Sequence, residues 1–100
     1  MDYIKTLKDF YGIGREALHL ISGISADALM RYEKGEEAPR KYRMLLNAML
    51  DIPTFETFFH LSKGLLNASD IDKIEKKIVE EMKWRERQVR EYRKESMNVG

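Results

Sequence analysis

The chain has 100 residues, of which 43% are hydrophobic, so it can form one small domain with a modest core. It has no cysteine, which excludes disulfides and thiolate zinc sites. Its 18 basic and 17 acidic residues nearly balance, so binding to a polyanion depends on where individual charges lie. We find no apolar run long enough for a membrane span and no signal-peptide core, and therefore expect a cytoplasmic protein with no membrane partner.

The first two predicted helices are short, and each ends near a glycine. Asp2 can cap a first helix over residues 3–10. This helix places Ile4 and Leu7 at helical spacing on one face, which is predicted to face the core. After a glycine-containing break, a second helix is predicted over residues 15–22. It ends at Gly23, which can take the positive φ that a helix C-terminus often needs.

The third predicted helix, residues 25–34, carries the clearest local signals. Ser25 can cap it by accepting hydrogen bonds from free backbone N–H groups. Asp27 lies in the first turn, where a negative charge suits the helix dipole. Leu29 and Tyr32 lie three residues apart and share a face. Because this helix follows the second one through a turn that contains glycine, the pair is predicted to form a helix-turn-helix.

Two more helices are predicted after the helix-turn-helix. Residues 40–50 follow Pro39, whose fixed φ and missing N–H suit a helix entrance. Residues 54–63 begin at a cap that is either Asp51 or Thr54. Apolar residues recur at helical spacing on both segments and are predicted to face the core. They are Tyr42, Leu45, Leu46, Met49, Phe55, Phe58 and Phe59.

The last predicted helix is the longest. Ser69 and Asp72 resemble a capping box, with Asp in place of the usual Glu, and predict a helix over residues 70–94. No segment has the alternating pattern of a strand. The fold prediction is therefore all-α, with a five-helix domain over residues 1–66 and an additional long C-terminal helix within residues 67–100.

The motif around the third helix resembles a known family. GIS at residues 23–25, RYEKG at residues 31–35 and the following Pro39 resemble the phage-repressor (Cro/C1-type, XRE) helix-turn-helix family. The chain is also similar to the helix-turn-helix part of antitoxin-type transcriptional regulators. The resemblance covers about residues 3–52 and extends more loosely to residue 66. It implies a five-helix, repressor-like domain that binds double-stranded DNA.

A helix-turn-helix reads DNA mainly with the N-terminal half of its second helix. The candidate residues there are Ser25, Ala26, Asp27 and Ala28, with Arg31 one turn further on. Arg31 can donate two parallel hydrogen bonds to guanine, or bind a phosphate. Ala26 and Ala28 allow close approach, and their methyl groups can meet a thymine methyl. Asp27 would repel phosphate, but it could accept a hydrogen bond from cytosine or orient Arg31.

Further cations flank this helix and could contact phosphates. Arg15 opens the second helix where the family usually has a glutamine, which by resemblance contacts the DNA backbone. Glu36 and Glu37 lie in the same region and weaken its positive field. The alternative interpretation is that these cations are ordinary solvated surface charges. The other candidates are Lys34, Arg40, Lys41 and Arg43.

Several other polar residues are interpreted as structural. Tyr32 is predicted to pack inward, and Glu33 is predicted to pair with a nearby cation or cap a neighbouring helix. His19 stands where the family usually has a small residue, and a partly buried, hydrogen-bonded histidine is the simplest interpretation. Zinc sites group their ligands more closely than His19 and His60. No catalytic motif is present, so we expect neither an enzyme nor a cofactor.

The C-terminal helix carries an apolar stripe, and its part before Met82, which contains Ile71, Ile74 and Ile78, is predicted to pack on the domain. Val89 and Tyr92 continue the stripe, and together with Trp84 they indicate self-association, with a solvated face as the alternative. We hypothesise a homodimeric transcriptional regulator, either a repressor or an antitoxin-like autoregulator. The alternative hypothesis is a protein-interaction module, such as an antitoxin or phage adaptor, that binds a toxin or another protein through this helix.

Overall fold

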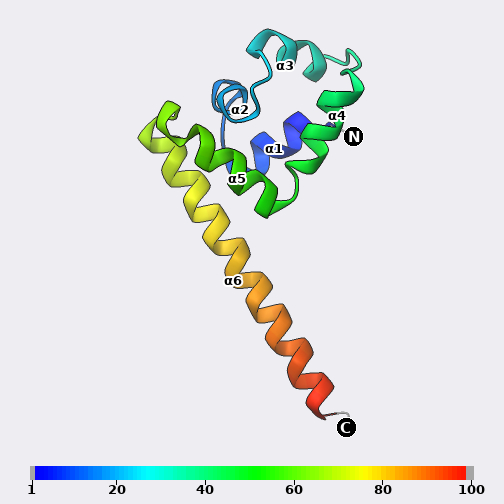
Figure 1. Ribbon diagram of the computed structural model, residues 1–100, viewed down its shortest axis with the longest axis vertical. Coiled ribbons are helices and arrows are strands. Elements are labelled where there is room, and N and C mark those ends of the chain that lie inside the picture. The colour runs from blue at the N-terminus through cyan, green and yellow to red at the C-terminus, as the bar shows by residue number, and fades with distance from the viewer. Residues whose placement is uncertain (1, 99–100) are drawn as a thin grey trace.

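The computed structural model describes residues 2–98, and the side chains of residues 2–94. Met1 and residues 99–100 of the predicted segments lie outside the described residues. The described chain is helical and has no strand, so the all-α prediction is confirmed (Figure 1). Its elements are α1 (Tyr3–Tyr11), α2 (Arg15–Ser22), α3 (Ala26–Glu33), α4 (Arg40–Ala48), α5 (Ile52–Ser62), the 3₁₀ turn η1 (Lys63–Leu65) and α6 (Ala68–Asn98).

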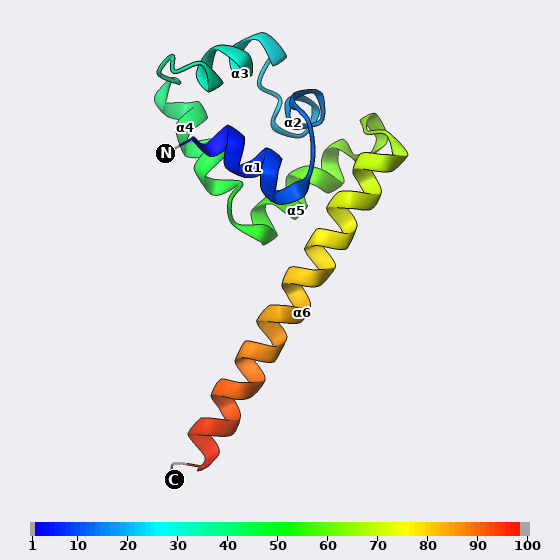
Figure 2. The same cartoon turned by 180° about the vertical axis from the view of Figure 1, so that it is seen from behind.

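The five shorter helices gather into one body, and α6 extends away from it (Figure 1). The view from behind shows the same separation, with most of α6 clear of the other helices (Figure 2). The molecule is elongated as a result, with extents of 56 × 31 × 19 Å. We call residues 3–66 the body.

Local signals set the ends of the first three helices as the sequence predicts. The Asp2 carboxylate caps α1 by accepting a hydrogen bond from a first-turn N–H at 3.0 Å. The Ser25 hydroxyl caps α3 in the same way at 3.1 Å. Gly12 and Gly23 end α1 and α2 with φ of 66° and 76°, a region that other residues rarely adopt. These ends limit α2 and α3 to eight residues each.

The fifth helix begins earlier than predicted. Its cap is Asp51, whose carboxylate accepts hydrogen bonds from the Thr54 N–H at 3.2 Å and from the Thr54 hydroxyl at 2.9 Å. The helix therefore starts at Ile52. Pro53 lies in the first turn, where its missing N–H costs no hydrogen bond, so it does not interrupt the helix. Gly64 continues the chain into η1 after the helix ends.

The predicted start of the last helix is wrong. Helix α6 begins at Ala68, because the side-chain oxygen of Asn67 accepts a hydrogen bond from a first-turn N–H at 2.8 Å. Ser69 therefore lies inside the helix and does not form the predicted capping box with Asp72. The helix runs for 31 residues and passes the predicted end at Lys94.

The core forms where the inner faces of the helices meet. Helix α2 packs on α3 and α5, and α1 packs on α3 and α4. The Tyr11 and Phe55 rings stack with centroids 3.7 Å apart and link α1 to α5. Burial of each large apolar side chain stabilises the fold by about 1.5–3 kcal/mol. The buried apolar residues are Ile4, Leu7, Tyr11, Ile13, Ala17, Leu18, Ile21, Ile24, Ala28, Leu29, Leu46, Met49, Ile52, Phe55, Phe59, Leu66, Ile74 and Ile78.

The first part of α6 belongs to this core, and the rest does not. Ile74 and Ile78 are buried where α6 contacts α1 and α5, as the sequence predicts. Met82 is 42% exposed, so the packed part of the stripe ends before Met82, as predicted. No described side chain beyond Ile78 is buried. None of the helices in the described residues is long and apolar enough to cross a membrane.

The Tyr11 hydroxyl is buried and has no hydrogen-bond partner among the described residues. Burial disfavours the charged form and raises the pKa of Tyr11 well above its ordinary value of 10.0. The negative charges of Glu81 and Asp51 act in the same direction, and Arg85 acts against them. Tyr11 is therefore a neutral, unpaired hydroxyl in the core, which costs the fold stability.

Candidate nucleic-acid interface

The turn between α2 and α3, residues 23–25, is held by hydrogen bonds. The buried Ser22 hydroxyl accepts from the Ile24 N–H at 3.1 Å. Nδ1 of His19 lies 2.7 Å from the Ile24 carbonyl oxygen and must carry its proton to donate to it. The prediction of a partly buried, hydrogen-bonded His19 is confirmed. The Ile24 side chain is also buried, so the turn is anchored to the core.

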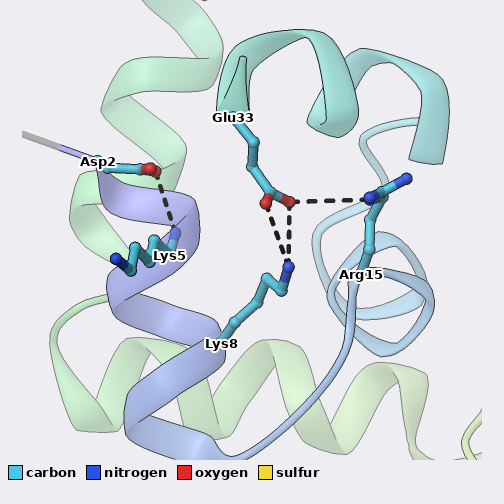
Figure 3. A network of polar contacts seen from close by, with 5 residues as sticks. All are labelled: Asp2, Lys5, Lys8, Arg15 and Glu33. Atoms are coloured by element: carbon cyan, nitrogen blue, oxygen red, sulfur yellow. Dashed lines mark hydrogen bonds and ion pairs between the residues drawn. The ribbon is translucent and has the colours of Figure 1, made fainter. Parts of the chain in front are cut away.

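Glu33 at the end of α3 ties three helices together (Figure 3). Its carboxylate lies 3.2 Å from Nζ of Lys8 on α1 and 3.8 Å from Nε of Arg15 at the start of α2. The Glu33 side chain is only 22% exposed, so these charges are partly shielded from water. The prediction that Glu33 pairs with a nearby cation is confirmed. Its neighbour Tyr32 packs partly buried against the core, also as predicted.

Helix α3 turns one face to the core and the other to solvent. Leu29 is fully buried, and Ala28 is only 6% exposed. The prediction that Ala28 approaches DNA is therefore wrong, because its methyl group lies on the inner face. Ala26 is half-buried, and Ser25 and Asp27 are exposed at the N-terminal end of the helix. The Ser25 hydroxyl is engaged in the cap, which is the role that the sequence favours.

Arg31 lies on the exposed face of α3 and is held by two carboxylates. Its Nε lies 3.6 Å from Asp27, and its NH1 nitrogen lies 3.4 Å from Glu36. The Arg31 side chain is 52% exposed, so water screens both pairs and each contributes about 1 kcal/mol at most. Arg31 can therefore exchange these partners for a base or a phosphate at small cost. The predicted role of Asp27 in orienting Arg31 agrees with this contact.

Two of the predicted phosphate ligands are engaged by carboxylates. Arg15 makes the contact with Glu33 already described, although its side chain stays 42% exposed. NH1 of Arg43 lies 3.2 Å from Glu37, which belongs to the loop before α4. Both pairs join elements that are close in space, so they stabilise the arrangement of α2, α3 and α4 around the exposed face.

The other three predicted phosphate ligands are exposed. Lys34 follows the last residue of α3, and Arg40 opens α4. The Lys41 Nζ lies 5.0 Å from the centre of the Tyr42 ring, a cation–π distance. No carboxylate among the described side chains lies within ion-pair distance of these three cations. They are available to an anionic ligand at the end of α3 and the start of α4.

Carboxylates outnumber cations within the segment that contains α3. Between residues 25 and 39 there are four acidic and two basic residues. They are Asp27, Glu33, Glu36, Glu37, Arg31 and Lys34. An approaching polyanion would meet little net attraction from this segment. Any positive field at this surface therefore comes from cations of other elements, such as Arg40 and Lys41 at the start of α4.

Two partners at this surface are not predictable from local spacing. Lys8 precedes Glu33 by 25 residues, and only the packing of α1 on α3 brings them together. Glu36 follows Arg31 by five residues, beyond the end of the helix. Gly35, with φ of 110°, turns the chain there, so the carboxylate comes back beside the arginine. The sequence shows that the loop after α3 is acidic, but it does not show that Glu33 pairs with Lys8 or that Glu36 pairs with Arg31.

The polar groups around this surface were also considered as metal ligands and as the lining of a hollow. No group of three or more His, Asp or Glu side chains within the described chain could hold a metal ion. A hollow lies between the start of α1, the end of α3 and the loop before α4, and Asp2, Tyr32 and Glu37 are among its lining residues. That lining contains no serine, histidine or lysine.

Comparisons with protein-family models, with curated proteins and with solved structures found no match to this chain. Inference about function therefore depends on the residues of α3 and its surroundings. Their arrangement combines a short, capped helix with an exposed arginine and a rigid attachment to α1 and α2.

Proposed function

We propose that this protein is a sequence-specific DNA-binding regulator of transcription with a repressor-like helix-turn-helix fold. Helix α3 would enter the major groove of double-stranded DNA. The observation that carries the proposal is the exposed face of α3, with Arg31 on it and the Glu33 contacts holding the helix against α1 and α2. A reading helix needs this combination of a free outer face and a fixed position.

Each exposed side chain then has a distinct role. Arg31 releases Asp27 and Glu36 and donates to a guanine edge. Three exposed lysines and arginines near α3 and α4 bind phosphates and set the register of the helix in the groove. They are Lys34, Arg40 and Lys41. Arg15 either keeps its contact with Glu33 or adds a further phosphate contact.

We further propose that the regulator acts in the cytoplasm as a homodimer, a repressor or an antitoxin-like autoregulator. The apolar side chains of Val79, Met82, Val89 and Tyr92 are exposed on α6 and support self-association. A dimer would present two copies of α3 to a site with two-fold symmetry. A truncation that tests the dimer must keep Ile74 and Ile78, because both are buried in the core.

The proposal predicts that Arg31→Ala weakens binding to specific DNA about 10- to 100-fold, as expected for losing a bidentate base contact. Fluorescence anisotropy of a labelled duplex from upstream of the protein's own gene measures this, with scrambled duplex as competitor. Lys76→Ala is the matched control. Lys76 is also an exposed cation that pairs with a carboxylate four residues earlier, Asp72 at 3.0 Å, but it lies on α6.

Two results would separate the alternatives. If specific binding exceeds scrambled binding and only Arg31→Ala removes the difference, α3 reads the sequence. If Arg31→Ala and Lys76→Ala behave alike and the two duplexes bind equally, the proposal is wrong. The full chain is used throughout, so that α6 and any dimer stay intact.

A second function is favoured by the excess of carboxylates around α3. In this alternative the protein is an interaction module, such as an antitoxin or phage adaptor, that keeps the fold and binds a toxin or other protein through α6. The salt dependence of DNA binding, measured together with the ratio of specific to scrambled binding, distinguishes the two functions. Phosphate contacts make the affinity fall steeply as salt rises, whereas an interaction module shows weak binding with little specificity.

A further inference from the structure

The last part of α6 is a projecting helix with no buried side chain among residues 79–94, and we call these residues the arm. It is about 24 Å long at the usual helical rise. Its far end lies at the opposite end of the molecule from α3 (Figure 1). Because none of these side chains is buried in the core, their charged and apolar groups can contact a partner molecule.

The arm is basic from residue 83 onward, whereas its first residues and the preceding part of α6 are not. Residues 70–82 contain three basic and five acidic residues, whereas residues 83–94 contain six basic and two acidic residues. The two carboxylates in the second segment are Glu86 and Glu91. The six cations are Lys83, Arg85, Arg87, Arg90, Arg93 and Lys94. The nearly neutral chain therefore concentrates its positive charge at one end.

Four of these cations lie on one face of the arm, and we call them the basic stripe: Lys83, Arg87, Arg90 and Lys94. They follow one another at intervals of four, three and four residues, which is the spacing of one helical face. The first three line a single shallow hollow, together with Glu80 and Glu86. No carboxylate among the described side chains lies within ion-pair distance of those three.

A second copy of this chain does not suit the basic stripe. Pairing two copies over residues 83–94, in either direction, would bring cations against cations. The apolar residues Met82 and Val89 lie on another side of the helix, so the basic stripe stays open even in a dimer. The partner that fits is one with regularly repeated negative charge.

The DNA backbone has this property. A duplex carries one negative charge for about every 1.7 Å of its axis. The basic stripe from Lys83 to Lys94 spans about 16 Å, over which a duplex presents roughly ten charges. Long, exposed lysine and arginine side chains can reach several of these phosphates without reading any base.

We infer that the basic stripe binds the phosphate backbone of double-stranded DNA as a second, sequence-independent contact surface. The inference rests on the proposed function, because it takes the same duplex as the partner. The arm extends away from α3 toward the other end of the molecule, so the phosphates that it contacts lie outside the site that α3 reads (Figure 1). The arm adds its own long-range attraction to that of the few cations near α3.

The test removes three charges of the stripe in the full chain, with Lys83→Gln, Arg87→Gln and Arg90→Gln combined. Glutamine keeps a high helix propensity, and circular dichroism checks the helix content. The matched control combines Lys5→Gln, Lys73→Gln and Lys76→Gln, which removes the same charge from exposed positions outside the arm. The measurement is anisotropy of a scrambled, labelled duplex over a range of salt concentrations.

The stripe variant should bind about tenfold more weakly or worse at low salt. The slope of log affinity against log salt should fall by about one for each lost phosphate contact. The control should keep the wild-type slope. A wild-type slope in the stripe variant, or an equal loss in the control, would overturn the inference. A changed oligomeric mass with an unchanged slope would assign the stripe to self-association and overturn it too.

A charge-preserving variant and the α3 variant complete the test. The variant Arg87→Lys with Arg90→Lys should keep the wild-type slope of log affinity against log salt, because attraction to phosphate needs the positive charge and not the guanidinium group. A smaller slope in this variant would contradict the inference. Arg31→Ala should change the ratio between specific and scrambled binding, whereas the stripe variant should weaken both alike. If Arg31→Ala has no effect and the stripe variant still loses slope, the α3 proposal fails and the arm contact stands.

Discussion

The body and the arm use their charged residues in different ways. In the body, five of the nine cations lie within ion-pair distance of a carboxylate, mostly from another element. They are Lys8, Arg15, Arg31, Arg43 and Lys63. Among residues 83–94, none of the six cations has such a partner within the described side chains. Charges in the body help to fix the fold, and those of the arm remain free for a ligand.

The two regions also differ in what keeps them helical. Short helices such as α2 and α3 are not stable alone and depend on burial of their inner faces. No side chain of the arm is fully buried, so its helix depends mainly on the propensity of its residues and on continuity with the packed start of α6. Substitutions should therefore act on stability in the body and on binding in the arm.

The largest expected contrast is between a core phenylalanine and an arm valine. Phe59→Ala should lower the free energy of unfolding by about 3–5 kcal/mol, because Phe59 is fully buried and the change leaves a cavity. In the single chain, Val89→Ala should change it by less than about 0.5 kcal/mol, because Val89 is 49% exposed there. Urea unfolding measures both. A cost for Val89→Ala that grows with protein concentration would come from the proposed dimer, whereas a large cost that is independent of concentration would contradict the contrast.

A smaller contrast concerns the carboxylates of the two regions. Glu33→Gln keeps the shape of the side chain but removes its attraction to Lys8 and Arg15, and should destabilise the body by about 1 kcal/mol. Glu86→Gln in the arm should leave stability unchanged. High salt should reduce the effect of Glu33→Gln, since salt screens the lost attraction. Equal effects of the two variants in urea unfolding would remove the distinction between the regions.

The smallest expected effect is at the point where the body meets α6. Tyr11→Phe removes a buried hydroxyl without a partner and keeps the stacking on Phe55, so it should raise stability by up to about 1 kcal/mol at neutral pH. The pKa of Tyr11 is raised in the folded state, so the wild type should lose stability as pH rises above 10. The advantage of the variant should then increase. Urea unfolding of both proteins at neutral pH and above pH 10 tests this, and a destabilised variant would show that the hydroxyl has a partner.

Much of the local structure of the body is predictable from the sequence. Asp2, Gly23 and Ser25 act within one helical turn of their own positions, so their effect depends on neighbouring residues only. The start of α6 is predicted wrongly because two neighbouring residues, Asn67 and Ser69, are both good caps. Local signals cannot rank them. Asn67 caps the helix in the folded chain, where Leu66 before it is buried and fixes the approach of the chain.

The candidate site is less predictable than the fold. Spacing indicates that Leu29 and Arg31 lie on different faces of α3, but it does not show that Ala28 is buried. The carboxylate neighbours of Arg31 and Arg15 come from a turn and from another helix, so no local pattern contains them. The basic stripe of the arm, in contrast, is visible in the sequence as evenly spaced lysines and arginines.

Local patterns in the sequence are enough to predict the helices, most of their ends, their apolar faces and the excess of positive charge near the end of the chain. Each of these depends on interactions within about one helical turn. Only the packing of the helices brings Glu33 on α3 to Lys8 on α1 and Arg15 on α2. These pairings depend on contacts between residues far apart in the chain, which form only when the helices pack.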